Sequence, residues 1–244
     1  MAQNIYDDAD FFRRYSQIAR QTQGLAGAPE WPTLESLLPS MAGARVLDLG
    51  CGFGWFSRWA VGAGAGSVVG VDLSERMLAR ARSETTDSRI TYLHADLDNI
   101  EFERANFDLA FSSLTLHYVR GLSALFDKVH GALRSGGRLV FSAEHPILLA
   151  PSSPDWRSFG TAGDVVWPLN RYLEEGPRAV DWLGSSVEKQ HRTVATYLNS
   201  LIRTGFTIRH VEEWGPSLEQ VRERPEWAVE RNRPYFLLVA AQRS

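Results

Sequence analysis

The sequence predicts an α/β fold in which a mostly parallel sheet carries helices on both of its faces. Short apolar runs of strand length alternate along the chain with segments that show helical spacing of apolar residues, and this alternation is typical of parallel sheets. Right-handed crossovers leave few ways to wind such a sheet. The chain has 244 residues, of which 44% are hydrophobic, so we expect residues 1–244 to form a single domain around one substantial core.

Seven runs along the chain have the length and apolar character of strands. Five of them are Val46–Leu49, Ser67–Asp72, Ile90–His94, Phe107–Ser113 and Arg138–Ala143. The last two are Thr207–Val211 and Tyr235–Ala240.

The helices predicted between these strands place their apolar residues on one face. They are Trp55–Ala60, Ser74–Ser83, Leu122–Leu133 and Thr193–Thr204. Ser74 and Thr193 are suited to cap the amino ends of their helices, because their side chains can accept a backbone N–H. Gly205 and the run Ser135-Gly136-Gly137 supply helix stop signals.

Two segments lie outside this frame. Residues 1–40 hold an aromatic helix followed by a second apolar stretch, and we expect them to form an N-terminal helical cap. Residues 146–190 contain several aromatic side chains but little periodicity. A connection this long inside a compact domain is usually functional, and it starts at the sheet edge where ligands bind. We therefore expect residues 146–190 to be a lid over the site.

Charge and composition exclude several classes of protein. The net charge is −3, with 26 basic and 29 acidic residues spread along the chain, which offers no electrostatic footprint for a nucleic-acid partner. No apolar run approaches the roughly 20 residues of a membrane span. The N-terminus lacks the basic start and apolar core of a secretory signal, so we expect a cytoplasmic protein. The single cysteine, Cys51, excludes an internal disulfide and fits a reducing compartment, and we predict no metal site.

One stretch carries a ligand-binding pattern, an apolar strand with an acid near its end and then three alternating glycines: Val46-Leu47-Asp48-Leu49-Gly50-Cys51-Gly52-Phe53-Gly54. Glycines so placed let a ligand approach the backbone at the carboxyl edge of a parallel strand. Asp48 would repel the pyrophosphate of a dinucleotide and favour a ligand with an ammonium and a sulfonium group. The spacing of Gly50, Gly52 and Gly54 also differs from the G-x-G-x-x-G of dinucleotide-binding proteins.

This stretch resembles the first motif of the class I S-adenosylmethionine (AdoMet)-dependent methyltransferases. The resemblance covers roughly residues 44–145 and is closest to the domain typical of ubiquinone and menaquinone biosynthesis enzymes and of many small-molecule methyltransferases. It implies a Rossmann-like seven-stranded sheet whose last two strands form an antiparallel hairpin, with AdoMet as the cofactor.

Two further acids end the next strands and extend the predicted cofactor site. Asp72 lies about 20 residues after the glycines, where a carboxylate accepts bonds from ribose hydroxyls. By resemblance, Asp96 meets the adenine amino group. The other positions expected to line the cofactor are Cys51, Leu73, Met77, Leu97, Ser112, Ser113 and the covering side chain Tyr15. A small residue packed in a tight turn explains Cys51 equally well, and packing on the core explains Tyr15.

Three histidines are candidates for handling an acceptor proton. His117 follows strand four, where the family often has an aromatic residue or a histidine beside the methionine moiety. His145 belongs to the step Glu144-His145-Pro146, and Glu144 and His145 project beside the predicted methyl donor. His191 belongs to His191-Arg192-Thr193, a step that some bacterial members of the family share. Each also has a structural alternative: a packed imidazole, a lid-orienting hydrogen bond, or a helix start.

The sequence therefore predicts methyl transfer from AdoMet to a small-molecule acceptor by in-line displacement. The segment after strand four lacks the Asn or Asp, two prolines and aromatic residue typical of enzymes that methylate nucleobase or glutamine amino groups. Two other classes stay open at this point: a non-catalytic AdoMet-binding protein and, less favoured by Asp48 and the glycine spacing, an NAD-dependent oxidoreductase. The sequence is compatible with a monomer or a homodimer.

Overall fold

The computed structural model describes residues 3–160 and 164–244 and is built on one seven-stranded sheet. Its strands are β1 (Arg45–Leu49), β2 (Ser67–Asp72), β3 (Ile90–His94), β4 (Phe107–Ser113), β5 (Leu133–Glu144), β10 (Phe206–Trp214) and β11 (Phe236–Arg243). Their order is β10-β11-β5-β4-β1-β2-β3. Strands β1 to β5 pair in parallel, whereas β11 runs antiparallel to both β5 and β10. The predicted fold class and the antiparallel C-terminal pair are confirmed.

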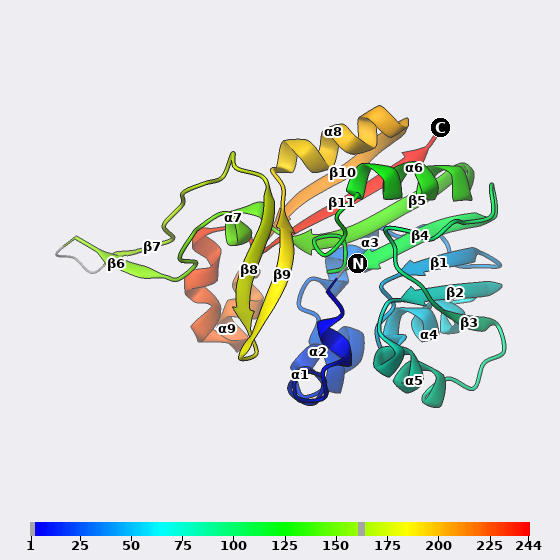
Figure 1. Cartoon of the computed structure of the whole chain (residues 1–244), viewed down its shortest axis with the longest axis horizontal. Coiled ribbons are helices and arrows are strands. Elements are labelled where there is room, and N and C mark those ends of the chain that lie inside the picture. The colour runs from blue at the N-terminus through cyan, green and yellow to red at the C-terminus, as the bar shows by residue number, and fades with distance from the viewer. Residues whose placement is uncertain (1–2, 161–163) are drawn as a thin grey trace.

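Helices cover both faces of this sheet, as Figure 1 shows. One face carries α3 (Trp31–Leu37), α4 (Trp55–Gly62) and α5 (Glu75–Ser83), and the other carries α6 (Leu122–Ala132) and α8 (Val194–Thr204). On the first face, Phe56 of α4 stacks on Phe111 of β4 with ring centroids 3.6 Å apart. On the second, Tyr197 of α8 and Phe126 of α6 pack against Phe141 of β5. Burying these rings supplies much of the apolar contact between sheet and helices.

Two predicted helix starts follow from side-chain caps. The hydroxyl of Ser74 accepts the backbone N–H of Met77 at 3.1 Å and begins α5. The hydroxyl of Thr193 accepts the backbone N–H of Thr196 at 3.1 Å and begins α8. Gly205 takes a left-handed conformation with φ 99° and ends α8, as predicted.

The predicted boundary between the Leu122–Leu133 helix and the strand that follows it is wrong. We expected a helix to Leu133 and a strand from residue 138, with glycines between them as a stop signal. In the structure α6 ends at Ala132, and Leu133 already pairs with Phe107 of β4. Gly136, with φ 77°, lies within β5, where the register with β4 shifts. The glycines thus serve an irregularity inside a strand rather than a helix terminus.

The N-terminal segment is a series of short helices: η1 (Ile5–Asp7), α1 (Ala9–Tyr15), α2 (Ala19–Thr22) and η2 (Gly24–Gly27). It is fastened to the sheet through Asp7, whose carboxylate accepts the Ser74 hydroxyl at 2.6 Å and the Arg76 backbone N–H at 3.1 Å. The amide of Asn4 donates to the carbonyl of Leu73 at 3.2 Å. These contacts hold the segment beside the corner between β2 and α5.

The segment after β5 contains more regular structure than the sequence suggested. It holds α7 (Pro146–Leu149) and two hairpins, β6 (Arg157–Phe159) with β7 (Asp164–Val166) and β8 (Gly176–Trp182) with β9 (Ser185–His191). Residues 161–163, and residues 1–2 of the predicted cap, lie outside the described residues. Strands β8 and β9 are joined by Leu183 and Gly184, whose φ values of 53° and 69° match a tight hairpin turn.

The β8–β9 hairpin lies against the N-terminal segment at the carboxyl ends of the parallel strands (Figure 1). The Arg14 guanidinium donates to the Ser185 hydroxyl at 3.0 Å, and the ring of Phe11 meets Trp182 edge-on at 5.5 Å. Between β10 and β11 the chain forms α9 (Leu218–Glu223) and η3 (Pro225–Asn232). None of the helices in the described parts of the chain has the length and apolar content needed to cross a membrane.

The cap of α8 gives a stability prediction. Replacing Thr193→Ala removes the side-chain acceptor for Thr196, and losing an N-cap costs about 1 kcal/mol. We expect a melting temperature about 2–4 °C lower, measured by calorimetry. Ser123→Ala, at an exposed position of α6, is the matched control and should leave the melting temperature nearly unchanged. Equal effects of the two substitutions would contradict the capping role.

Candidate active site at the carboxyl ends of the parallel strands

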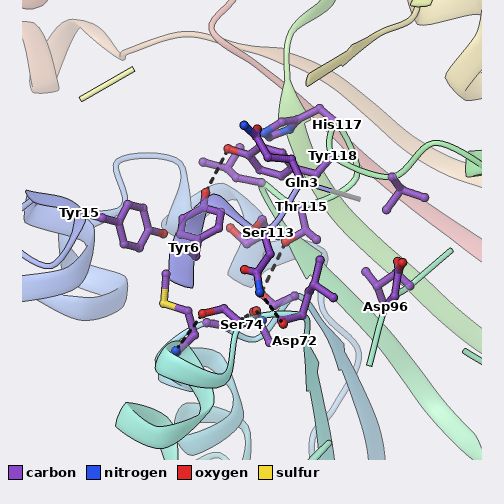
Figure 2. Close-up of a pocket in the computed structure, with 18 of the residues that line it drawn as sticks. Gln3, Tyr6, Tyr15, Asp72, Ser74, Asp96, Ser113, Thr115, His117 and Tyr118 are labelled. Carbon is purple, nitrogen blue, oxygen red and sulfur yellow. Dashed lines mark hydrogen bonds between the residues drawn. The ribbon is translucent and has the colours of Figure 1, made fainter. Parts of the chain in front are cut away.

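A cavity that is partly open to solvent lies where the parallel strands end. The turn after β1 and the ends of β2, β4 and β5 contribute to its wall, and side chains of the N-terminal segment and the β8–β9 hairpin cover it. Figure 2 shows the hydroxyl groups of Tyr6 and Tyr118 meeting at the wall of the cavity, with Tyr15 beside Tyr6. The Tyr6 hydroxyl donates to the Tyr118 hydroxyl at 3.0 Å. This is the sheet edge at which α/β proteins bind ligands.

The glycine turn after β1 has two distinct structural requirements. At Gly50 a side chain would collide with Thr115, because an ideal Cβ would lie 2.1 Å from the Thr115 Oγ1. At Gly52, with φ 52°, a Cβ would meet no described heavy atom within 4 Å, and this glycine lines the cavity. The backbone at Gly52 is therefore open to a ligand.

Asp72 lies on the cavity wall and holds the turn in place. One carboxylate oxygen accepts the backbone N–H of Gly52 at 2.8 Å, and the other accepts the backbone N–H of Ser74 at 2.9 Å. Burial outweighs these hydrogen bonds and raises the pKa of Asp72. Each oxygen keeps a lone pair for a further donor. Asp96, which also lines the cavity, accepts the backbone N–H of Asp98 at 3.0 Å and the Asn99 amide at 3.0 Å.

Asp48 does not reach the cavity. Its carboxylate is only 2% exposed and accepts the Ser57 hydroxyl at 2.6 Å. Burial is the main reason that the pKa of Asp48 rises to about 7, and the charge of Asp72 adds to it. Gly54 caps α4, Cys51 is buried, and the Ser112 hydroxyl donates to the carbonyl of Leu49 at 3.0 Å. These residues stand behind the cavity wall.

The remaining predicted cofactor residues all line the cavity: Tyr15, Leu73, Met77, Leu97 and Ser113. Tyr15 accepts a hydrogen bond from the Gln21 amide at 2.8 Å and meets Tyr6 edge-on at 5.0 Å. Burial raises the pKa of Tyr15 to about 12, so its hydroxyl stays protonated near neutral pH. It can therefore donate a hydrogen bond into the cavity.

Among the three predicted histidines, His117 lines the cavity. Its Nδ1 accepts the backbone N–H of Glu144 at 3.3 Å, which leaves the proton of the neutral ring on Nε2. Burial, with contributions from the charges of Lys189 and Arg192, lowers the pKa of His117 to about 4. His117 is thus neutral near pH 7 and already uses its basic nitrogen, so it can donate a hydrogen bond but has no free nitrogen to take a proton.

His145 and His191 are not brought to the cavity. His145 caps α7 by accepting the Ile147 backbone N–H on Nδ1, and its Nε2 lies 2.9 Å from a carboxylate oxygen of Glu213. His191 is fully buried in β9, with its Nε2 2.9 Å from the carbonyl of Tyr172. Burial lowers the pKa of both rings. Their hydrogen bonds fit the structural alternatives, and we assign neither a proton-transfer role.

Several lining residues were not predicted from the sequence: Gln3, Asn4, Arg20, Thr115, Tyr118 and Trp182. Thr115 and Tyr118 stand in the same run after β4 as Ser113 and His117, and that adjacency was the available signal. No predicted site residue lies in the same run as Arg20, so the sequence did not point to it. Its Nη2 donates to both carboxylate oxygens of the fully buried Glu30, at 2.6 and 2.8 Å, so a pairing across the N-terminal segment positions it.

Comparison with known proteins gives the family. Residues 47–141 match the family model of a methyltransferase domain. The crystal structure of an S-adenosylmethionine dependent methyltransferase from Mesorhizobium loti is 56% identical, with a TM-score of 0.87, and the match covers 90% of this chain and 100% of that one. The chain belongs to the S-adenosylmethionine-dependent methyltransferases. This methyltransferase therefore uses a donor that supplies a methyl group on a positively charged sulfur.

Two relatives have names that specify an acceptor. A malonyl-[acyl-carrier protein] O-methyltransferase from Erwinia pyrifoliae is 33% identical, and the match covers 72% of this chain and 67% of the relative. A tRNA U34 carboxymethyltransferase from Methylococcus capsulatus is 30% identical over 81% of this chain and 55% of the relative. The relatives of this methyltransferase thus include enzymes with quite different acceptors.

The residues of this methyltransferase fit the donor. The open backbone at Gly52 accommodates a close ligand. The carboxylates at the ends of β2 and β3 suit a molecule with hydroxyl groups and positive charges. Among the described lining residues the cationic side chain is Arg20, and Glu30 pairs with it.

The raised pKa of Asp48 gives a pH prediction. An unfolded aspartate has a pKa near 3.9, whereas the pKa of folded Asp48 is about 7. The folded state therefore binds the proton more tightly, and this contribution to stability is lost as the pH rises from about 4 to about 7. Asp48→Asn keeps the side-chain size but cannot titrate. We expect its melting temperature to fall less between pH 5 and pH 8 than that of the wild type.

The control for this experiment is Asp87→Asn, which replaces a partly exposed aspartate whose pKa the Arg89 side chain lowers to about 2. Asp87 is ionised in both states above pH 5, so its replacement should not change the slope. The same slope in the wild type and Asp48→Asn would show that the buried carboxyl does not titrate in this range.

Proposed function

We propose that this methyltransferase transfers the AdoMet methyl group to a small molecule enclosed in the cavity. The observation that carries the proposal is the enclosure itself, because aromatic side chains from two segments far apart in sequence cover one cavity. Within a single domain, we assign residues 1–40 as the cap and residues 146–190 as the lid. The buried single cysteine fits the cytoplasm as the compartment.

We further propose that Asp72, Asp96 and the backbone at Gly52 hold the cofactor, and that Tyr15 covers it. Asp72 and Asp96 end the second and third parallel strands, so they would bind the adenosine side of the donor. This leaves the ends of β4 and β5 for the acceptor. Tyr6, Tyr118 and Trp182 would then exclude water from the reaction.

Alignment is the main catalytic contribution that the chain has to make. The donor sulfur is already a good leaving group, so the protein must chiefly hold the attacking atom in line. Such positioning lowers a barrier by about 7–11 kcal/mol, whereas a general base contributes about 10²–10⁴-fold in rate. The enclosed cavity supports this mechanism without a dedicated proton-transfer residue.

The charge of the cavity argues against a polyanionic acceptor. Its described lining includes four carboxylates, Asp72, Asp96, Asp98 and Glu144, and the whole chain carries a net charge of −3. A tRNA acceptor would meet repulsion at this surface. Since this chain spans only 55% of the tRNA-modifying relative, that activity is not the one we propose here.

Asp72→Ala tests the cofactor assignment. Charge-assisted hydrogen bonds are worth about 1.5–3 kcal/mol each, so losing one to a ribose hydroxyl should weaken AdoMet binding at least about tenfold. Titration calorimetry measures the affinity. Asp127→Ala, at an exposed site on α6, is the control and should bind normally. A folded Asp72→Ala protein with wild-type affinity would contradict the assignment.

Turnover tests the acceptor class. Purified protein with AdoMet should release S-adenosylhomocysteine with at least one small hydroxyl, amine or carbon acid, measured by chromatography. Saturating AdoMet, at about 100 times its dissociation constant, should stabilise the protein by around 2.7 kcal/mol, whereas NAD should have no effect. Binding without turnover on every acceptor class would instead support a non-catalytic AdoMet-binding role.

A further inference from the structure

Glu144 is the carboxylate at the acceptor end of the cavity. It ends β5 and lines the cavity, on the side away from Asp72 and Asp96. Its Oε1 accepts a hydrogen bond from the Nζ of Lys189 at 2.5 Å. Its Oε2 has no hydrogen-bond partner in the parts of the chain that the structure describes. Glu144 therefore keeps one oxygen for a ligand.

Glu144 is held in its charged form. Burial opposes ionisation, but the positive charges of His117 and Lys189 and the Lys189 hydrogen bond outweigh it and lower the pKa of Glu144. Because His117 is neutral near pH 7, Lys189 is the group that keeps Glu144 ionised at that pH. The carboxylate thus faces the cavity as an anion.

Aromatic rings surround the same place. Tyr118 and Trp182 line the cavity, and the ammonium of Lys189 lies 5.9 Å from the ring centroid of Tyr118 and 5.0 Å from that of Trp182. Lys189 itself is only 2% exposed. A protein ammonium is therefore already accommodated between these rings and Glu144. Aromatic faces together with a carboxylate are the combination that binds organic ammonium groups.

We propose that Glu144, with Tyr118 and Trp182, selects a small-molecule amine as the methyl acceptor. This inference rests on the proposed function and names its substrate class. In the reaction, the bound ammonium first releases one proton to solvent through the open side of the cavity. The lone pair of the resulting neutral amine then forms the N–C bond while the S–C electron pair stays on sulfur, and the nitrogen becomes a methylated ammonium. Glu144 stabilises the positive charge that appears there, and His117 cannot take that role because it carries no negative charge.

The same charge disfavours a carboxylate acceptor. An acid bound at this place would meet the free Oε2 of Glu144, which can donate no hydrogen bond to a carboxylate, while Lys189 is already paired with Oε1. The malonyl-directed relative has such an acid in the name of its acceptor. The inference thus predicts an acceptor of a different class from the one in that relative's name.

The preference for an amine can be tested by binding alone, with ligands that share a carbon skeleton and differ in one functional group. The protein saturated with S-adenosylhomocysteine is titrated with phenethylamine, 2-phenylethanol and phenylacetate, and in parallel with butylamine, 1-butanol and butyrate. In at least one series we expect the amine to bind about tenfold more tightly than the alcohol, and the acid to show no binding. An acid that binds as tightly as the amine, or an amine that raises no melting temperature in either series, overturns the proposal.

Glu144→Gln tests the named residue. The substitution keeps the side-chain size and removes the charge, so the amine affinity should fall about tenfold while the affinity for S-adenosylhomocysteine stays unchanged. Glu188→Gln is the matched control, since Glu188 is an exposed carboxylate on β9 that pairs with Arg120 and should keep wild-type amine binding. Unchanged amine binding in Glu144→Gln overturns the assignment.

Removing the charge of Glu144 alone leaves the buried Lys189 without its partner, which can prevent folding. The double variant Glu144→Gln/Lys189→Met removes both charges together and gives the same readout. These binding outcomes can be told apart from a failure of the proposed function. Failure of the wild type to release S-adenosylhomocysteine would contradict catalysis on these acceptors, whereas loss of amine preference in binding concerns Glu144 alone.

Discussion

The structure of the site depends on one carboxylate that bridges two backbone turns. Asp72 accepts N–H groups from Gly52 and Ser74, so it joins the glycine turn after β1 to the start of α5. Ser74 in turn donates to Asp7 of the N-terminal segment. A single strand-end acid thereby fixes the turn, the helix start and the cap relative to one another, and the cavity wall takes its shape from these bonds.

The parts of the fold that sequence could predict are those with local causes. Strands β1 to β4 and the caps of α5 and α8 follow from apolar runs and from hydroxyls that accept N–H groups three residues on. Gly136 and Gly137 were wrongly predicted to separate α6 from the next strand. A helix stop and an irregularity inside a strand both favour glycine, so the residue type does not distinguish them. Only pairing with β4, a non-local contact, decides between them.

The site itself could be predicted only in part, for the same reason. Asp72 and Asp96 reach the cavity because parallel strands end at one edge. Asp48 also lies near the end of a parallel strand, but its carboxylate accepts the Ser57 hydroxyl and does not reach the cavity. The imidazole of His145 contacts the carboxylate of Glu213, which lies 68 positions later in the sequence. The β8–β9 hairpin was not predicted, and its docking on the N-terminal segment depends on pairs more than 170 residues apart.

The Glu144–Lys189 pair is hard to explain by stability alone. Burying two charges costs several kcal/mol per ion, and replacing such a pair by apolar residues of similar volume is often neutral or stabilising. Here the pair stands at the edge of an apolar, ring-lined part of the cavity, with Lys189 almost fully buried and Glu144 lining the cavity. An apolar pair would pack there as well but would leave no anion facing the acceptor. The energetic cost of the pair is therefore understandable as the cost of keeping Glu144 charged and fixed.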